Sequence, residues 1–241
     1  MGIIKTKGIV LLESNMKDYD KMVTILTPNM GKIGCAARGA RRNKSTLMAG
    51  TQFLSFSDFI IYSSPSSYSI NSCDTIEVFY NIRQDIDKLN YAALAARMIF
   101  DVTYENQYSY NILQLLLNTL YVISETDTDL DFVLSVFKMR LMTYLGFTPE
   151  ISKCINCGEN DKISYFSIKD SGFKCAACSK ADKSAIKMSA GTFNAIKYII
   201  TSPAKKLFSF KVSKDSLKEL KLISDLYSSD KLDKNYNVQK L

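Results

Sequence analysis

Four cysteines lie in two closely spaced pairs in the second half of the chain. Cys154 and Cys157 form the first C-x2-C pair, and Cys175 and Cys178 form the second after seventeen intervening residues. This spacing is typical of zinc sites, in which four thiolates surround one ion tetrahedrally. Because four thiolates leave no coordination position open, the sequence predicts one structural Zn²⁺ ion and no catalytic metal.

The residues between the two cysteine pairs predict a β-hairpin. Two short runs, 165–168 and 173–174, flank the turn sequence Asp170-Ser171-Gly172. A hairpin between two C-x2-C pairs is the arrangement of a zinc ribbon. The alternatives are a redox C-x-x-C pair, which lacks a surrounding βαβ pattern here, and a metal-free remnant. The other two cysteines, Cys35 and Cys73, lie in strand-like runs and are predicted to be small buried side chains.

A second cluster, in the first part of the chain, is basic. Arginine is rare, yet three of the six arginines fall within five residues. The cluster holds five cations and no acid in thirteen residues, namely Lys32, Arg38, Arg41, Arg42 and Lys44. Guanidinium groups suit phosphate oxygens, so the cluster predicts binding to a nucleic-acid backbone. The alternative is a solvated loop on a basic protein; the nearby phenylalanines are assigned to a core.

Composition excludes several classes of enzyme. The chain has no histidine, which removes Ser–His and Cys–His nucleophile pairs, HExxH peptidases and zinc deaminases. There is no P-loop and no dinucleotide-binding fingerprint. Paired carboxylates such as Asp85/Asp87 and Asp127/Asp129 sit at expected helix starts, where capping explains them. An enzyme would therefore have to rely on carboxylates, lysine, tyrosine or a metal.

The elements that must position these clusters fall into two kinds. Residues 1–80 contain short β-type runs with turns between them, and predict a five-stranded barrel or sandwich; the strands are expected at 9–12, 22–27, 32–37, 53–62 and 68–80. Helical periodicity then takes over, and the expected helices span 91–104, 108–123, 129–144, 189–201 and 213–227. The charge-free stretch Asn106–Ser124 has polar residues and helical spacing, and predicts a buried helix and no membrane span.

Two sequence stretches together resemble the bacterial RecO family. The first runs from Gly8-Ile9-Val10-Leu11 through Gly31-Lys32 to Arg38-Gly39-Ala40-Arg41-Arg42. The second is Leu145-Gly146-Phe147-Thr148-Pro149, followed by Cys154-x-x-Cys157-Gly158. The resemblance covers nearly the whole chain. It implies an α+β multidomain protein with an N-terminal OB-fold barrel at 1–82, a helical bundle domain at 83–150 and 182–241, and an inserted four-cysteine zinc ribbon at 151–181.

The resemblance also implies a function. Members of the family act as recombination mediators without turnover chemistry in the bacterial cytoplasm, at the nucleoid. They bind single- and double-stranded DNA, anneal complementary strands, and act with RecR and the C-terminal tail of single-strand binding protein. Through these contacts they help RecA to replace that protein on DNA. The basic-cluster residues would then be the first DNA contacts.

The chain departs from the family pattern at residues 15–19 and at its C-terminal segment 236–241. Other functions also stay open. A zinc-ribbon regulator or RNA-binding protein would use the C-terminal part, where residues 151–241 hold seventeen lysines and nine acidic residues. A carboxylate-dependent nuclease would need Mg²⁺, and a scaffold would bind proteins and no nucleic acid.

Overall fold

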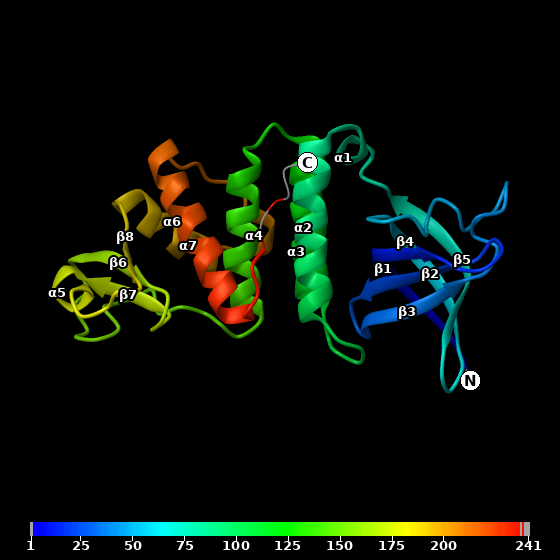
Figure 1. Cartoon of the computed structure of the whole chain (residues 1–241), viewed down its shortest axis with the longest axis horizontal. Helices are drawn as coiled ribbons and strands as arrows, with labels where there is room; N and C mark the ends of the chain where they lie inside the picture. The colour runs from blue at the N-terminus through cyan, green and yellow to red at the C-terminus, as the bar shows by residue number, and fades with distance from the viewer. Residues whose placement is uncertain (1, 237, 239–241) are drawn as a thin grey trace. The chain divides into compact units, whose positions relative to one another are not determined.

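The computed structural model describes residues 2–236 and residue 238. Residues 237 and 239–241, in the C-terminal segment that departs from the family pattern, therefore lie outside the described residues. The chain divides into two compact units, residues 1–124 and residues 125–241 (Figure 1). The first contains five strands and three helices, and the second contains further helices and a small sheet, which confirms the mixed α+β prediction.

The first unit begins with a closed five-stranded barrel. Its strands are β1 (Gly2–Asn15), β2 (Lys21–Thr27), β3 (Gly31–Ala37), β4 (Phe56–Ser63) and β5 (Tyr68–Glu77). The long β1 pairs with β2 through its second half and with β4 through its first half, while β3 closes the barrel by a parallel pairing with β5. This order, β1-β2-β3-β5-β4, is the arrangement expected of the OB-fold.

Side chains alternate between the barrel core and solvent. In β3, Ile33, Cys35 and Ala37 are buried and the intervening residues are more exposed, as the period of two in a strand requires. Cys35 and Cys73 both belong to this core, which confirms their assignment as buried small side chains. Of the three phenylalanines assigned to a core, Phe59 is fully buried and belongs to it, whereas Phe53 and Phe56 are half-buried and do not.

Two predicted strands are longer than the strands of the structure. In the predicted strand 53–62, strand geometry starts only at Phe56. The Phe53 N–H donates to the Glu13 side chain (Oε1, 3.1 Å) and not to a backbone carbonyl of a neighbouring strand. The run 68–80 ends at Glu77, where the chain turns through the left-handed conformation of Phe79 (φ 49°) into a short helix. Neither the start of β4 nor the end of β5 is marked by the local hydrophobicity of the sequence.

The barrel continues directly into helices α1 (Tyr80–Gln84), α2 (Ile86–Val102) and α3 (Tyr110–Glu125). Asp85 caps α2 by accepting from the N–H groups of Asp87 and Lys88, which confirms its predicted capping role. Buried apolar residues recur along α2 and α3 at helical spacing. Within the described residues, no helix is both long and apolar enough to cross a membrane.

Backbone hydrogen bonds join the barrel to the α2–α3 connection. Lys32 N donates to Tyr104 O (3.1 Å), Asn106 N to Met30 O (2.9 Å) and Ser109 N to Pro28 O (2.8 Å). The β2–β3 turn is therefore held against the end of α2, which explains why the barrel and these helices form one compact unit.

The second unit is built on three long helices. They are α4 (Leu130–Tyr144), α6 (Ala190–Thr201) and α7 (Lys214–Leu232), with the short η1 (Ala204–Lys206) between the last two. Asp129, Ser189 and Ser213 cap them, and of these three caps the sequence predicts Asp129. All residues from 132 to 142 are buried, including two cations. Lys138 is paired with Asp225 (2.6 Å) of α7 and donates to Tyr236 O (3.1 Å), which holds Tyr236 against these helices.

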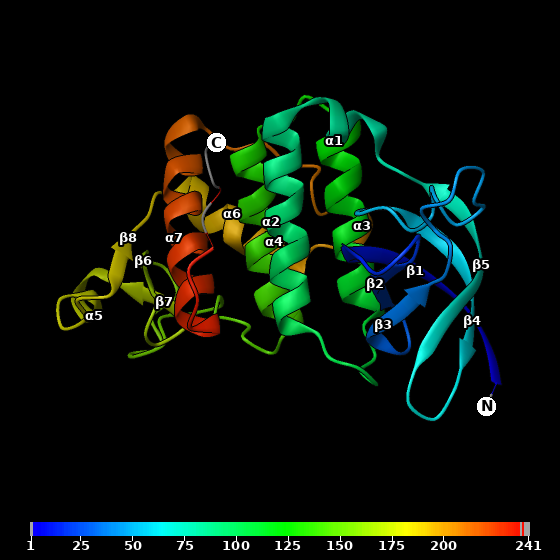
Figure 2. The same ribbon diagram turned by 45° about the vertical axis from the view of Figure 1, so that its right-hand side comes forward.

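The predicted hairpin forms two strands of a three-stranded sheet in the order β7-β6-β8, in which β6 is the central strand. Its elements are β6 (Ile163–Ser167), β7 (Gly172–Cys175) and β8 (Ala185–Lys187), with the short helix α5 (Ala176–Ser179) after β7. Phe166 packs edge-to-face on Tyr227 of α7 with ring centroids 5.3 Å apart, so the sheet lies beside that helix (Figure 2).

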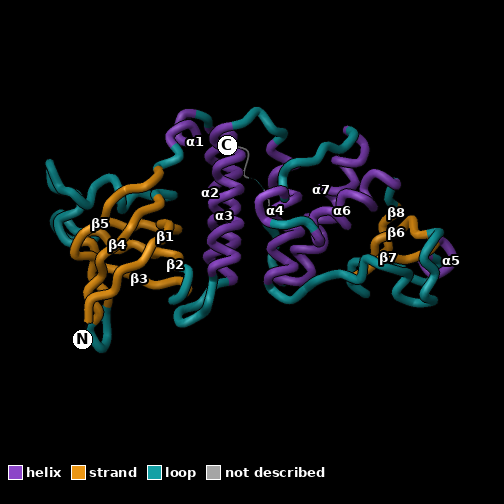
Figure 3. The backbone as a smooth tube through the Cα atoms, turned by 180° about the vertical axis from the view of Figure 1, so that it is seen from behind, coloured by secondary structure: helices purple, strands orange, loops and turns teal. Residues whose placement is uncertain are grey.

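The strands thus belong to two separate sheets, the barrel and the small sheet (Figure 3). The two compact units place α1–α3 with the barrel, whereas the predicted domain division at residue 82 follows the change from strands to helices. The predicted division into barrel, helical domain and insert stays a prediction.

Candidate nucleic-acid interface and metal centre

The basic loop, residues 38–44, directly follows β3 and begins the long connection to β4. Arg38, Arg41, Arg42 and Lys44 are all exposed. Ala40 between them is buried in the barrel core and fixes the base of the loop. Two positive backbone angles, at Gly39 (φ 66°) and Lys44 (φ 68°), mark the turns. The structure therefore brings these four cations together on one anchored loop.

The basic loop is held by the β1–β2 loop, residues 16–20. Asp20 Oδ1 accepts from the Gly39 N–H (2.7 Å), and the Arg41 N–H donates to Tyr19 O (2.9 Å). The Arg41 guanidinium donates to Asp18 O (3.2 Å), and that of Arg42 lies 5.9 Å from the centre of the Tyr19 ring. The sequence segment that departs from the family pattern is thus the support of the basic loop.

Lys32 lies apart from the other four predicted contacts. It stands near the start of β3, whereas the basic loop follows the end of that strand about 20 Å away at roughly 3.3 Å per residue. Its ammonium donates to Phe100 O and lies 3.9 Å from the centre of the Phe100 ring. Burial lowers its pKa, an effect that nearby Asp101 opposes. Lys32 is therefore engaged with α2, and its role as a DNA contact stays a prediction.

The far end of the β3–β4 connection is anchored by residues that sequence reasoning did not single out. Arg83 of α1 donates to Gln52 Oε1 (2.6 Å) and to Phe53 O (2.8 Å). Glu13 of β1 accepts from the Phe53 N–H and is paired with Lys21. A signal existed for Arg83, since it is one of only six arginines, but its partner lies thirty residues away in the sequence.

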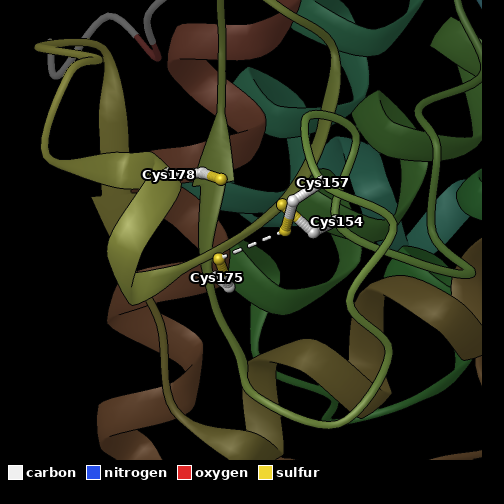
Figure 4. A group of neighbouring side chains, drawn as sticks. All are labelled: Cys154, Cys157, Cys175 and Cys178. Atoms are coloured by element: carbon white, nitrogen blue, oxygen red, sulfur yellow. Dashed lines mark hydrogen bonds between the residues drawn. The ribbon is translucent and has the colours of Figure 1, made fainter.

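The four cysteines converge on one point: Cys154 and Cys157 come from the loop before β6, Cys175 ends β7, and Cys178 lies in α5. Their sulfur atoms all lie within 4.8 Å of one another (Figure 4). The Cys157 and Cys175 sulfurs are 3.7 Å apart. Four sulfurs at about 2.3 Å from a tetrahedral ion would be about 3.8 Å from each other. The spacing of the donors therefore fits one metal ion, and the cluster fits a zinc ribbon.

The surroundings favour the thiolate at two of the four cysteines, whereas contacts with neighbouring cysteine sulfurs raise the pKa of Cys157 and Cys178. Burial alone would raise the pKa of Cys154, but N–H groups of Cys157, Cys175 and Asn156 donate to its sulfur and lower the pKa to about 6. The Cys178 N–H similarly lowers the pKa of Cys175. The thiolate is the form that ligates a metal, so two of the donors are prepared for binding.

A buried ion pair supports the ribbon beside the cluster. The Lys174 side chain is 3% exposed, and its ammonium contacts Asp182 (2.8 Å) and Asp170. Asp182 also accepts from the hydroxyl groups of Ser167 and Ser184. Lys174 directly precedes Cys175 of the cluster. Its contacts tie β7 to the turn before this strand, through Asp170, and to the segment after α5, through Asp182.

Comparison with known proteins agrees with this architecture. The family described as Recombination protein O N terminal matches residues 1–79, and Recombination protein O C terminal matches residues 83–240. The chain belongs to the RecO family. It is 44% identical over 237 residues to the curated DNA repair protein RecO of Acetivibrio thermocellus, covering 98% of this chain and 94% of that protein. The RecO protein of Alkaliphilus metalliredigens is 34% identical, covering 98% of this chain and 96% of that protein.

Membership of the RecO family gives the chain a role in DNA repair and recombination. It also agrees with the two features that the structure builds from the sequence. The exposed basic loop belongs to the N-terminal family region, and the four-cysteine cluster belongs to the C-terminal one.

Proposed function

We propose that this protein is a recombination mediator that binds single- and double-stranded DNA and anneals complementary strands. The observation that carries the proposal is the basic loop, an anchored loop with four exposed cations at the rim of an OB-fold barrel. Loops and strand faces of this fold bind oligonucleotides in other proteins. Phosphate contacts are independent of sequence, as annealing of any two strands requires.

The mechanism is physical and needs no turnover chemistry. Two DNA strands repel each other through their phosphates. Cations of the protein neutralise part of that charge and release counterions, which lets complementary strands approach and pair. In this proposal the protein acts in the bacterial cytoplasm at the nucleoid. RecR and the C-terminal tail of single-strand binding protein are its direct partners. Through these contacts the protein helps RecA to be loaded onto the DNA.

We further propose that the metal of the ribbon is one structural zinc ion held by the four cysteines. Four thiolates are typical of structural zinc, and they leave no position for a substrate. Its contribution is to hold β6, β7 and the segments that carry the cysteines together. Metal analysis of protein purified without chelator should find about one zinc per chain; protein that is folded and metal-free would contradict this.

Annealing tests the proposed function. Two complementary strands coated with single-strand binding protein are mixed with and without the protein over a salt series. We expect acceleration that weakens as salt rises. If the four exposed cations contact a single strand, log K should fall against log salt with a slope near −2.8, about 0.7 for each contact. No acceleration by folded, zinc-loaded protein would favour a regulator or scaffold, and sequence-selective or RNA-selective binding would favour the regulator.

Replacing the three arginines of the basic loop tests whether these side chains contact DNA phosphates. R38A/R41A/R42A should bind all DNA sequences more weakly, with a slope shallower by about 2. Loss confined to one sequence would indicate base readout and would contradict a phosphate contact.

A further inference from the structure

A second positively charged surface lies in the other compact unit, on the connection between α6 and α7. Residues 203–214 contain no acidic residue. They carry four exposed lysines, named here the α6–α7 lysines: Lys205, Lys206, Lys211 and Lys214. None of the four has an ion-pair partner among the described residues. Lys214 is the first residue of the nineteen-residue helix α7; the acid that follows it, Asp215, is paired with Lys218 (3.3 Å), and the positive end of the helix dipole lies at the same place.

A cavity opens beside these lysines. It has a volume of about 560 Å³, and the aromatic residues Phe132, Phe208 and Phe210 line it together with Lys211. Phe210 packs edge-to-face against Phe132 with centroids 5.0 Å apart, and lies 4.8 Å from the Tyr198 ring. Cations interleaved with aromatic side chains are the combination that binds single-stranded nucleic acid.

Two acidic residues in the cavity favour one orientation of a bound single strand. Asp127 and Asp129 both line it, and the Asp129 carboxylate accepts from the Phe132 N–H (3.1 Å). Carboxylates repel phosphate but accept hydrogen bonds from the amino groups of bases. The phosphates therefore belong at the α6–α7 lysines, and a base belongs inside the cavity.

We propose that the α6–α7 connection is a second single-strand-binding surface, at which the lysines contact phosphates and the cavity accepts one unstacked base. This proposal rests on the proposed function and adds a part to it, because a protein that anneals must hold two strands. One strand would bind at the basic loop of the first unit and the other at the α6–α7 surface of the second.

A bridging assay on the full-length, zinc-loaded protein tests the second surface. One strand is fixed to a surface and captures the protein, and a labelled, non-complementary strand is then added. The wild type should hold both strands. A variant with the four α6–α7 lysines changed to glutamine should still bind one strand but should lose most capture of the second. R38A/R41A/R42A should behave in the same way, because it also keeps one of the two surfaces.

A matched control removes the same charge from the ribbon: K153Q/K162Q/K180Q/K183Q changes four lysines that are also exposed. This control should bridge as the wild type does. If the α6–α7 variant bridges normally, or if the control loses as much as that variant does, the second surface is overturned. If the wild type binds no strand at all, the proposed function itself fails. The two failures are therefore distinguishable.

Binding of a base in the cavity can be tested without substituting any of the residues that pack around it. R38A/R41A/R42A keeps only Lys44 of the four basic-loop cations, so the α6–α7 surface should carry most of the remaining binding. This variant should bind a normal strand about fivefold or more tightly than an abasic strand, since stacking of a base is lost. Equal affinity would overturn the base site. A short acidic peptide is offered as competitor. Peptide binding in this cavity that a single strand cannot displace would overturn the nucleic-acid assignment.

Discussion

At the scale of single residues, the buried Asp182–Lys174 pair of the ribbon makes a sharp prediction. Asp182→Asn keeps the shape and one acceptor oxygen, which can still accept from Ser184, but it removes the charge that faces Lys174. Removing one partner of a buried ion pair usually costs about 3 kcal/mol or more. Because Asp170 still neutralises Lys174, we expect the free energy of unfolding to fall by about 2 kcal/mol. Urea titration at pH 7 measures this.

The same residue predicts a dependence on pH. Burial alone would raise the pKa of Asp182, but the Lys174 ammonium and the Ser167 and Ser184 donors lower it well below its usual range. A lowered pKa contributes stability that is complete above the unfolded value of about 3.9 and is lost as the pH falls below it. The stability difference between wild type and D182N should therefore shrink below about pH 4. A difference that stays constant down to pH 3 would show that the charge of Asp182 is unimportant.

The residues of the metal cluster could be predicted from the sequence, and the supports of the basic loop could not. Cys154 and Cys178 belong to a pattern with fixed short spacing, which can be recognised along the sequence alone. Asp20 and Gly39 meet only because β2 and β3 pair in a particular register, Lys21 opposite Ala37. Such contacts depend on the register of two strands, which local sequence patterns do not specify.

At the scale of elements, the contact between the β1–β2 loop and the basic loop predicts opposite effects of two substitutions. Asp20→Ala removes both a negative charge and the acceptor for the Gly39 N–H. Simple electrostatics would then predict tighter DNA binding, but we expect weaker binding, about threefold to tenfold, because the basic loop loses its anchor. Asp20→Asn, which keeps an acceptor oxygen, should bind DNA at least as tightly as the wild type. Anisotropy titration with a labelled strand compares the three proteins; tighter binding by D20A would show that the anchor is unimportant.

The turn between β2 and β3 predicts a contrast between two glycines of the same strand. Gly31 has φ 66°, and a Cβ there would overlap the Tyr104 carbonyl oxygen. Gly31→Ala should therefore destabilise the first unit by about 2 kcal/mol or more. Gly34→Ala is the control, because a Cβ at that position meets nothing within 4 Å; its effect should stay within about 0.5 kcal/mol. Thermal unfolding followed by circular dichroism tests both, and equal effects would contradict the close approach of β3 to the α2–α3 connection.

The strands and helices themselves were largely predictable, and their ends were not. Capping residues such as Asp85 and Asp129 mark helix starts correctly, since a cap is a local interaction. The end of β5 was misplaced because the left-handed turn at Phe79 involves a residue type that gives no turn signal. Short elements such as α1 and β8 also escaped prediction, since they are too short to show a period.

At the scale of the whole molecule, the two compact units predict a local effect of metal removal. A ribbon of about thirty residues is too small to be stable alone, and structural zinc typically supplies about 10–16 kcal/mol of binding free energy to such domains. Every identified anchor of the basic loop, from Glu13 to Arg83, lies within the first unit. Loss of the metal should therefore unfold the ribbon and leave the barrel and its basic loop intact.

Hydrogen exchange on the intact chain, before and after chelation, measures both units at once. Amides of β6 and β7 should lose most of their protection, whereas those of β1–β5 should exchange as before. Cys35→Ala is the matched control, because it removes a thiol from the barrel core: it should reduce protection in the barrel and leave the metal content unchanged. Simultaneous loss of protection in both units after chelation would show that they unfold together. The basic loop would then depend on the metal, and zinc would be part of how this protein binds DNA.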